Sequence, residues 1–345
     1  MKTPEQPAVS DSERDSAATG VSKSPIELFK VRHWAWYAAP MAECERRLAL
    51  ATAEPGGKIG EACSLTLEAG GKRLRPLLVF LAAQFGETIG EDLYSAAVAV
   101  ELVHMATLVH DDILDGAELR RGRPTLAAKY GSLMSMAAGD YLFSSAFGIL
   151  TGARSNRAIS MLSRASLDLS LGELAQRQQT GDFAMTTASY IERCRLKTSS
   201  LFSVACMMGA LLSGCSQETV KAMEEFGLRL GLAFQIADDI LDFSGESPEL
   251  GKRAGADLRD GTVTLPLLIA LARDATLIER LSGELTDSGI DSICRKVQAA
   301  GALDEAARQA REQVFRAIEA LEVASSELDI APLALVAEMA ADRKK

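Results

Sequence analysis

The amino-acid sequence predicts an all-α protein that folds as a single domain. Apolar residues recur at helical spacing along most of the 345-residue chain, and no segment alternates apolar and polar residues as a strand does. Aromatic residues make up only 5% of the chain, whereas Ala, Leu, Glu and Arg are abundant, which favours helix over sheet. A hydrophobic content of 48% is ample for a large core.

The chain begins with a polar segment, residues 1–24, that is rich in Ser, Asp, Glu and Pro, and we expect it to be a disordered tail. Residues 25–345 are assigned to one folded domain. Residues 26–37 concentrate Phe29, two tryptophans and Tyr37. This segment is interpreted as a helix that docks on the body or on a second subunit, with a peripheral membrane contact as the alternative.

Helices are expected throughout the rest of the chain, with bounds set by Gly, Pro and polar breaks. They are placed at residues 41–53, 58–69, 76–83, 91–114, 125–129, 131–150, 155–180, 187–213, 217–243, 263–282, 287–300, 303–327 and 331–342.

Charge and cysteine content restrict the function and the compartment. A net charge of −10 argues against a nucleic-acid partner, which normally requires a basic face. The six cysteines form no Cys-x-x-Cys pair, so we expect them to be reduced and buried. The N-terminus lacks the pattern of a signal peptide, and no uncharged apolar run approaches the roughly 18 residues of a membrane span. These features predict a cytoplasmic protein.

Three carboxylates, Asp111, Asp112 and Asp115, lie at the end of the apolar helix expected at 91–114. Asp111 and Asp115 are four residues apart, so they share one helix face and can bind the same cation. The dense cationic turn Arg120-Arg121-Gly122-Arg123 follows. Carboxylates suit a hard divalent ion and arginines suit phosphate oxygens, so the pattern predicts a site for a phosphorylated substrate bound with Mg²⁺.

The same five residues, Asp-Asp-Ile-Leu-Asp, recur at 238–242, again at the end of a long apolar helix. Neither copy has the alternating oxygen ligands of a calcium loop or the Glu-x-x-His pairs of a di-iron bundle. A single copy could be a solvated helix end, but two matched copies indicate a functional site. The second copy contributes Asp238, Asp239 and Asp242.

Other polar groups are candidates for anion binding. The loop Gly70-Gly71-Lys72-Arg73-Leu74-Arg75-Pro76 places three cations beside a helix start, and the alternative is a solvated loop with a capping glycine. His104 lies two turns before Asp111 on the same face, and Gln235 precedes Asp238 by three residues. Lys197-Thr198 and Gly251-Lys252 are polar pairs beside apolar helices.

Taken in order, these motifs resemble the trans-isoprenyl diphosphate synthases, the polyprenyl synthetase family. The matching segments are Gly-Gly-Lys-Arg-x-Arg-Pro at 70–76, His-x6-Asp-Asp-x-x-Asp at 104–115, Arg-Arg-Gly-x-Pro-Thr at 120–125, Gly-Asp-Tyr at 139–141, Lys-Thr at 197–198, Gln-x-x-Asp-Asp-x-x-Asp at 235–242, Gly-Lys at 251–252 and Thr-Leu-Pro at 264–266. The resemblance covers roughly residues 60 to 275. It implies a helical bundle around a central cavity, with residues 25–345 as the catalytic domain.

The resemblance also implies roles for the candidate residues. A magnesium cluster on the diphosphate of an allylic substrate would be held by Asp111, Asp115 and Asp238, helped by Asp112, Asp239 and Asp242. The same diphosphate would contact Arg120, Lys197, Thr198, Gln235 and Lys252. Isopentenyl diphosphate would be bound by Lys72, Arg75, His104 and Arg121, and no role is assigned to Arg73 or Arg123. Asp111, Asp115, Asp238, Lys197 and Arg120 would carry the catalysis.

Product length is expected to depend on the helix before Asp111. Thr107, Ala106 and Val103 are small or medium-sized, where a bulky aromatic residue would stop chain growth early in the resembling family. A long-chain product such as a quinone side-chain precursor is therefore expected, although a floor at Leu142, Phe143 or Phe147 would shorten it. The run from His104 to His110 most resembles heptaprenyl-type synthases with two components. A homodimer is expected, with a hetero-partner subunit as the alternative.

Three rival functions remain at this stage. A geranylgeranyl or farnesyl diphosphate synthase differs only in product length. A terpene cyclase or head-to-head condensing enzyme needs no isopentenyl diphosphate site, so Lys72, Arg75 and His104 argue against it. A non-catalytic synthase subunit would be expected to have lost aspartates, and both motifs are intact.

Overall fold

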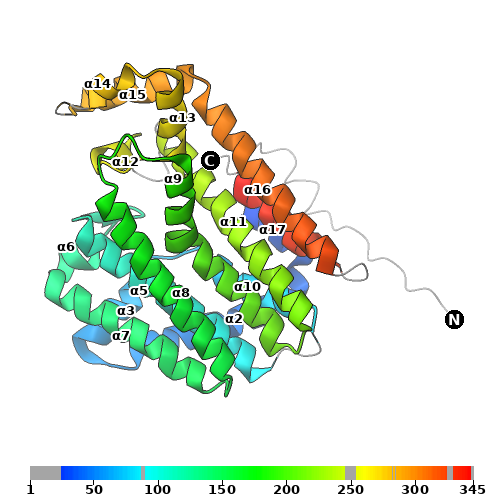
Figure 1. Cartoon of the computed structure of the whole chain (residues 1–345). Coiled ribbons are helices and arrows are strands. Elements are labelled where there is room, and N and C mark those ends of the chain that lie inside the picture. The colour runs from blue at the N-terminus through cyan, green and yellow to red at the C-terminus, as the bar shows by residue number, and fades with distance from the viewer. Residues whose placement is uncertain are drawn as a thin grey trace, which may run out of the picture.

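The computed structural model describes residues 25–86, 90–244, 254–281, 283, 285–324 and 329–342, with backbone alone at residues 25–36, 323 and 324. The expected disordered tail, residues 1–24, and Lys252 lie outside these residues. The described chain is almost entirely helical, which confirms the all-α prediction (Figure 1).

The helices follow the expected order with small shifts at their ends. They are α2 (Pro25–Ala53), α3 (Gly57–Glu68), α4 (Leu74–Ala83), α5 (Glu91–Leu114), α6 (Leu126–Tyr130), α7 (Ser132–Thr151), α8 (Asn156–Gln178), α9 (Thr187–Cys194), the π-helix η2 (Arg195–Ser199), α10 (Ser200–Leu212), α11 (Gln217–Phe243), α12 (Ala256–Arg259), α13 (Leu265–Arg273), α14 (Leu277–Leu281), α15 (Asp287–Ala299), α16 (Ala302–Ala324) and α17 (Ala331–Ala341).

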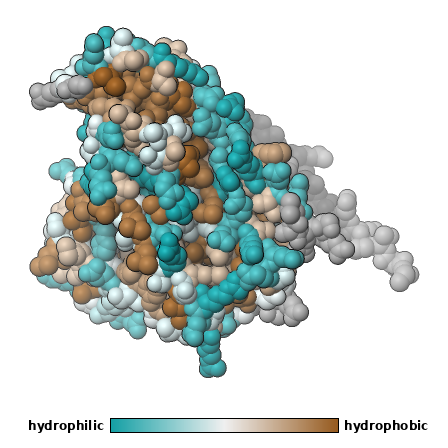
Figure 2. All heavy atoms as spheres, viewed as in Figure 1, coloured by the Kyte–Doolittle hydropathy of each residue, from teal (hydrophilic) through white to brown (hydrophobic). Residues whose placement is uncertain are grey.

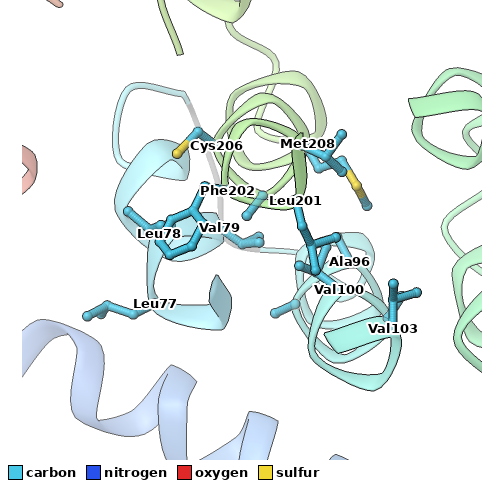
Figure 3. Close-up of a cluster of buried hydrophobic side chains, with 14 of the residues drawn as sticks. Leu77, Leu78, Val79, Ala96, Val100, Val103, Leu201, Phe202, Cys206 and Met208 are labelled. Carbon is cyan, nitrogen blue, oxygen red and sulfur yellow. The ribbon is translucent and has the colours of Figure 1, made fainter. Parts of the chain in front are cut away.

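Helix α5 forms the centre of the larger hydrophobic core. Its residues are buried at almost every position from Leu93 to Ala106, because α4, α7 and α10 pack around it. Figure 3 shows side chains of α10 meeting those of α4 on one side and those of α5 on the other. A second core cluster joins α11 to α13, α15 and α16, and α12–α15 gather at the upper end of the molecule in Figure 1. A helix buried on all sides needs no amphipathic pattern, which is why α5 is apolar around its circumference.

The N-terminal helix is longer than the sequence analysis expected. Helix α2 continues through Pro40, where a helix start had been expected. Buried residues recur across the proline at Tyr37, Met41, Cys44 and Leu48, so one packed stripe compensates for the lost backbone hydrogen bond. The Tyr37 hydroxyl donates to Gln84 Oε1 over 3.0 Å, which docks this part of α2 on the body. The other aromatic side chains of residues 26–37 lie outside the described side chains.

A short β-hairpin interrupts the helices, although no strand was expected. Strands β1 (Leu119–Arg120) and β2 (Arg123–Pro124) pair antiparallel. Arg121 and Gly122 form the turn with φ values of 52° and 72°, the left-handed geometry of a type I′ turn. Two-residue strands are too short to create an alternating pattern, so only the Arg-Gly turn signals them.

Helices α5 and α7 are long and apolar enough to cross a membrane, contrary to the expectation from the sequence. The apolar window of α5 is 72% buried, as in the core helix of a globular domain, and that helix ends in three carboxylates. The corresponding window of α7 is only 33% buried. Helix α7 therefore leaves much of its apolar surface outside the core.

Candidate active site

The first carboxylate motif lies at the C-terminal end of α5 and is paired with cations from other elements. Asp112 is buried and accepts a hydrogen bond from Arg120 Nε over 2.8 Å. Asp115 accepts from Arg177 Nη2 of α8 over 2.6 Å. Burial raises the pKa of Asp111 to about 6, although Lys197 Nζ, at 4.0 Å from its Oδ2, opposes the shift. Chain folding thus supplies the cations that the local sequence of the motif lacks.

Lys197 and Thr198 lie in the π-helix η2, which joins α9 and α10 into one continuous helix where a regular α-helix was expected. A π turn adds a residue to one helical turn, and such turns are frequent at functional sites. Helix α8 packs very closely here, since a Cβ added to Gly172 would lie 2.5 Å from the backbone nitrogen of Lys197. The ammonium group of Lys197 donates to Glu173 on α8. Burial opposes ionisation of Glu173, but Lys197 and Arg177 lower its pKa.

The second carboxylate motif lies at the end of α11. Asp239 is buried and accepts hydrogen bonds from Tyr190 Oη over 2.6 Å and from Gln235 Nε2 over 2.8 Å. Burial raises the pKa of Asp239 to about 7, because these hydrogen bonds do not fully offset the lost hydration. Thr198 Oγ1 donates to Gln235 Oε1 over 2.7 Å. Gln235 therefore bonds Asp239, four residues on, and links the π-helix to the second motif.

Asp238 and Asp242 have different surroundings. Asp238 is exposed at the end of α11. The Asp242 carboxylate accepts from the backbone N–H groups of Ala256 and Asp257, over 2.9 and 3.2 Å. Asp242 thus acts as an N-cap for α12, although it lies on another helix. It positions the start of α12 beside the end of α11.

The basic loop before α4 is held by the arginines of the hairpin. Arg121 donates to the carbonyl of Gly70, and Arg123 Nη1 donates to that of Glu68 over 2.9 Å. A Cβ on Gly71 would lie 2.8 Å from Arg73 Nη1, so a side chain here would displace the Arg73 guanidinium. Lys72 is exposed at the edge of the loop. The hairpin and the loop therefore form one cationic unit.

Arg75 and His104 lie on the inner side of this unit. The Arg75 guanidinium stacks 4.6 Å from the centre of the Phe202 ring. Burial lowers the pKa of Arg75 to about 10, and the buried Glu101 opposes that change. Burial, together with the positive charges of Arg75, Arg121, Arg120 and Arg73, lowers the pKa of His104 well below its ordinary value. His104 is therefore a neutral hydrogen-bonding group here.

The donor set fits magnesium bound together with a diphosphate. In the part of the chain that the structure describes, no three His, Cys, Asp or Glu side chains converge on one point. Magnesium usually binds one or two carboxylates and takes its other ligands from water and substrate phosphates. Asp111 and Asp115 on one helix and Asp238 on another supply such carboxylates, and Lys197 and Arg120 lie beside them.

The structure adds site residues that sequence reasoning missed. They are Glu45, Glu101, Glu173, Arg177 and Tyr190, and Arg73, which had no role assigned from the sequence, bonds two of them. Glu173 and Arg177 have a local signal, an acid and a base four residues apart beside an apolar face. Tyr190 has none, because its partner Asp239 is 49 residues away.

An all-α bundle that presents two carboxylate motifs and two sets of phosphate-suited cations defines an enzyme site for diphosphate substrates. The family profile of the polyprenyl synthetases matches residues 57–295. The chain belongs to this family of trans-prenyltransferases.

Relatives and solved structures agree with this assignment. The chain is 44% identical over 232 residues to heptaprenyl diphosphate synthase component 2 of Geobacillus stearothermophilus, covering 67% of this chain and 72% of the relative. It is 35% identical over 270 residues to the octaprenyl diphosphate synthase of Haemophilus influenzae, with 77% and 82% covered. A polyprenyl synthase of Caulobacter crescentus, solved with calcium and isoprenyl diphosphate, superposes with a TM-score of 0.84 at 34% identity, covering 94% of this chain and 100% of that one.

Proposed function

We propose that this protein is a long-chain trans-polyprenyl diphosphate synthase that condenses isopentenyl diphosphate with an allylic diphosphate in the presence of Mg²⁺. One observation carries the proposal. The π-helix touches both carboxylate motifs, because Lys197 lies 4.0 Å from Asp111 and Thr198 bonds Gln235, which bonds Asp239. A single diphosphate between the motifs could therefore meet cations and carboxylates from both.

The residues of the chain have distinct parts in this reaction. When bound, Mg²⁺ would be held by Asp111, Asp115 and Asp238 and would stabilise the departing diphosphate. Lys197 and Arg120 bind the same diphosphate, so the allylic C–O bond breaks to leave a delocalised carbocation. Asp112, Asp239 and Asp242 orient their neighbours through the hydrogen bonds described above.

The second substrate occupies the cationic unit of loop and hairpin. Lys72, Arg75, His104 and Arg121 hold the diphosphate of isopentenyl diphosphate, with its double bond beside the carbocation. Proximity then supplies much of the rate. The new carbon–carbon bond forms from the double-bond electrons, and a proton leaves to the released diphosphate.

A long product is supported by the helix before Asp111. None of Val103, Ala106 and Thr107 is aromatic, although Val103 and Ala106 have no exposed surface in this structure. Named relatives include heptaprenyl and octaprenyl synthases, which supports a product used as a quinone side chain. A geranylgeranyl diphosphate synthase is the second candidate. It is favoured by a relative of that name from Methanosarcina mazei, which is 37% identical over 246 residues.

Product analysis tests the proposal directly. The purified protein is incubated with Mg²⁺, isopentenyl diphosphate and farnesyl diphosphate, and the prenyl chains are resolved by length. We expect hexaprenyl or longer chains. Arrest at geranylgeranyl would favour the second candidate, and absence of product would indicate a required partner subunit.

A homodimer is supported by an apolar face on α7 and α8, which lie side by side at the lower front of Figure 1. The large apolar side chains exposed on these two helices are Leu133, Met136, Leu167, Leu171 and Leu174. Figure 2 shows apolar residues on this side of the molecule. An exposed apolar patch of this kind suits a subunit interface. Two relatives are named as component 2 of a synthase, so a hetero-partner is the alternative.

Leu171→Glu tests this interface, because a charge in the centre of the face opposes burial. Light scattering should report dimers for the parent protein and monomers for the variant. A variant that stays dimeric would place the interface elsewhere. We also propose a cytoplasmic location, supported by the burial of the apolar window of α5 inside the fold.

A further inference from the structure

Glu101 is a charged residue buried in the middle of the apolar helix α5, and it is 3% exposed. It is the only Asp, Glu, Lys or Arg between Asp92 and Asp111. A buried carboxylate is costly unless cations or hydrogen bonds compensate for its lost hydration. Glu101 must therefore be explained by the groups around it.

Arg73 is the direct partner of Glu101. Its Nη1 lies 3.3 Å from Glu101 Oε1, its Nε donates to Glu45 Oε1 over 2.6 Å, and its Nη2 donates to the carbonyl of Leu67 over 3.0 Å. One guanidinium thus connects α2, the end of α3 and α5. Arg73 itself has left-handed backbone angles, φ 47° and ψ 38°, immediately before α4. Such a conformation needs anchoring contacts for a residue with a side chain.

Arg75 follows Arg73 by two residues, and the charge of Glu101 also acts on it. Its Nε is fully enclosed and has no hydrogen-bond partner, and the second oxygen of Glu101, Oε2, is likewise enclosed without one. Burial raises the pKa of Glu101, and the positive charges of Arg73 and Arg75 oppose that rise. His104 follows Glu101 by three residues, so it lies one turn further on the same face.

We propose that Glu101 is a positioning residue for isopentenyl diphosphate. It fixes Arg73, and through Arg73 the Gly70–Lys72 loop. It also supplies the counter-charge that holds Arg75 in place. The inference rests on the function proposed above. Glu101 touches no substrate atom; its effect passes through the cations that do.

Glu101→Gln tests the proposal with the least change of shape. The amide is neutral and its NH₂ group cannot accept from a guanidinium, so Arg73 and Arg75 both lose their counter-charge. Titration calorimetry with isopentenyl diphosphate alone measures binding without turnover. We expect about tenfold weaker binding, the scale of one charge-assisted hydrogen bond. The KM for isopentenyl diphosphate should rise by the same factor, whereas the KM for the allylic substrate should change by less than about twofold.

Glu43→Gln is the matched control, since Glu43 also pairs with arginines, Arg46 and Arg47, but on the outer face of α2. It should bind both substrates like the parent protein. If Glu101→Gln lowers the melting temperature so far that the protein is unfolded, Arg73→Lys replaces it. That variant keeps the charge but cannot reach three acceptors, and the same selective loss is expected.

Unchanged or tighter binding of isopentenyl diphosphate in Glu101→Gln would overturn the proposal, as would equal losses for both substrates. Tighter binding would mean that Glu101 merely repels the anionic substrate. If the parent protein itself fails to bind isopentenyl diphosphate, the proposed function fails instead. The two failures are therefore distinguishable.

Discussion

Replacement of Arg177 by alanine should tighten Mg²⁺ binding and lower the thermal stability of the metal-free protein. Its Nη2 lies 2.6 Å from Asp115 Oδ1 and its Nε lies 2.8 Å from Glu173 Oε1. An ion that binds Asp115 must therefore displace the guanidinium or share the carboxylate with it. The side chains of Arg177 and Asp115 are 40% and 35% exposed, so solvent screens the pair strongly.

The magnitude follows from that exposure. Partly exposed ion pairs contribute about 0.2–1 kcal/mol, and 1 kcal/mol corresponds to about a fivefold change in an equilibrium constant. Arg177→Ala should therefore bind Mg²⁺ up to about fivefold more tightly. Its metal-free melting temperature should fall by up to about 2 °C. Both effects should shrink at 1 M salt, where the Debye length is about 3 Å.

The assay is calorimetric titration of metal-free protein with Mg²⁺ at low and high salt. Arg195→Ala is the control, because Arg195 forms an exposed pair with Glu192 on α9. Weaker Mg²⁺ binding in Arg177→Ala would refute the reasoning, since it would mean that Arg177 orients Asp115 for the metal. An effect that persists unchanged at high salt would also contradict an electrostatic origin.

Three further predictions concern turnover, packing and product length. Asp111→Ala and Asp238→Ala should each abolish turnover while circular dichroism shows an unchanged helix content; near-normal activity in either would contradict the two-motif mechanism. Gly231→Ala should destabilise the protein by about 1–3 kcal/mol in urea unfolding, because its Cβ would lie 2.4 Å from Ser199 Cα; unchanged stability would mean that α11 can shift away from the π-helix. Ala106→Phe should shorten the prenyl product by chromatography, and an unchanged length distribution would move the length-setting wall to another helix.

Several features of the site could be read from local sequence alone. Asp111 and Asp115 share a face because helical spacing places residues four apart together, and the repeated Asp-Asp-Ile-Leu-Asp segment marks the second motif in the same way. The helix bounds from α5 to α11 were close to the expected ones for the same reason. Apolar periodicity and Gly or Pro breaks are properties of short segments, which need no knowledge of the fold.

Tertiary structure decided which groups meet. Arg177 reaches Asp115 across 62 residues of chain, and Tyr190 reaches Asp239 across 49. The π-helix at Lys197 packs closely against Gly172 and Gly231, which lie on other helices. The fold also gives Asp242 a contact that its sequence does not indicate, the cap of α12, and its part in metal binding stays a prediction.

The sequence by itself determined the helical class, the two carboxylate motifs and the cationic loop, because each is encoded by spacing within one or two turns. Packing alone determined the partners of those groups, since burial and counter-charge depend on elements that are distant in sequence. Glu101 illustrates the difference: in the sequence it is one acid in an apolar helix, and only the fold surrounds it with Arg73 and Arg75.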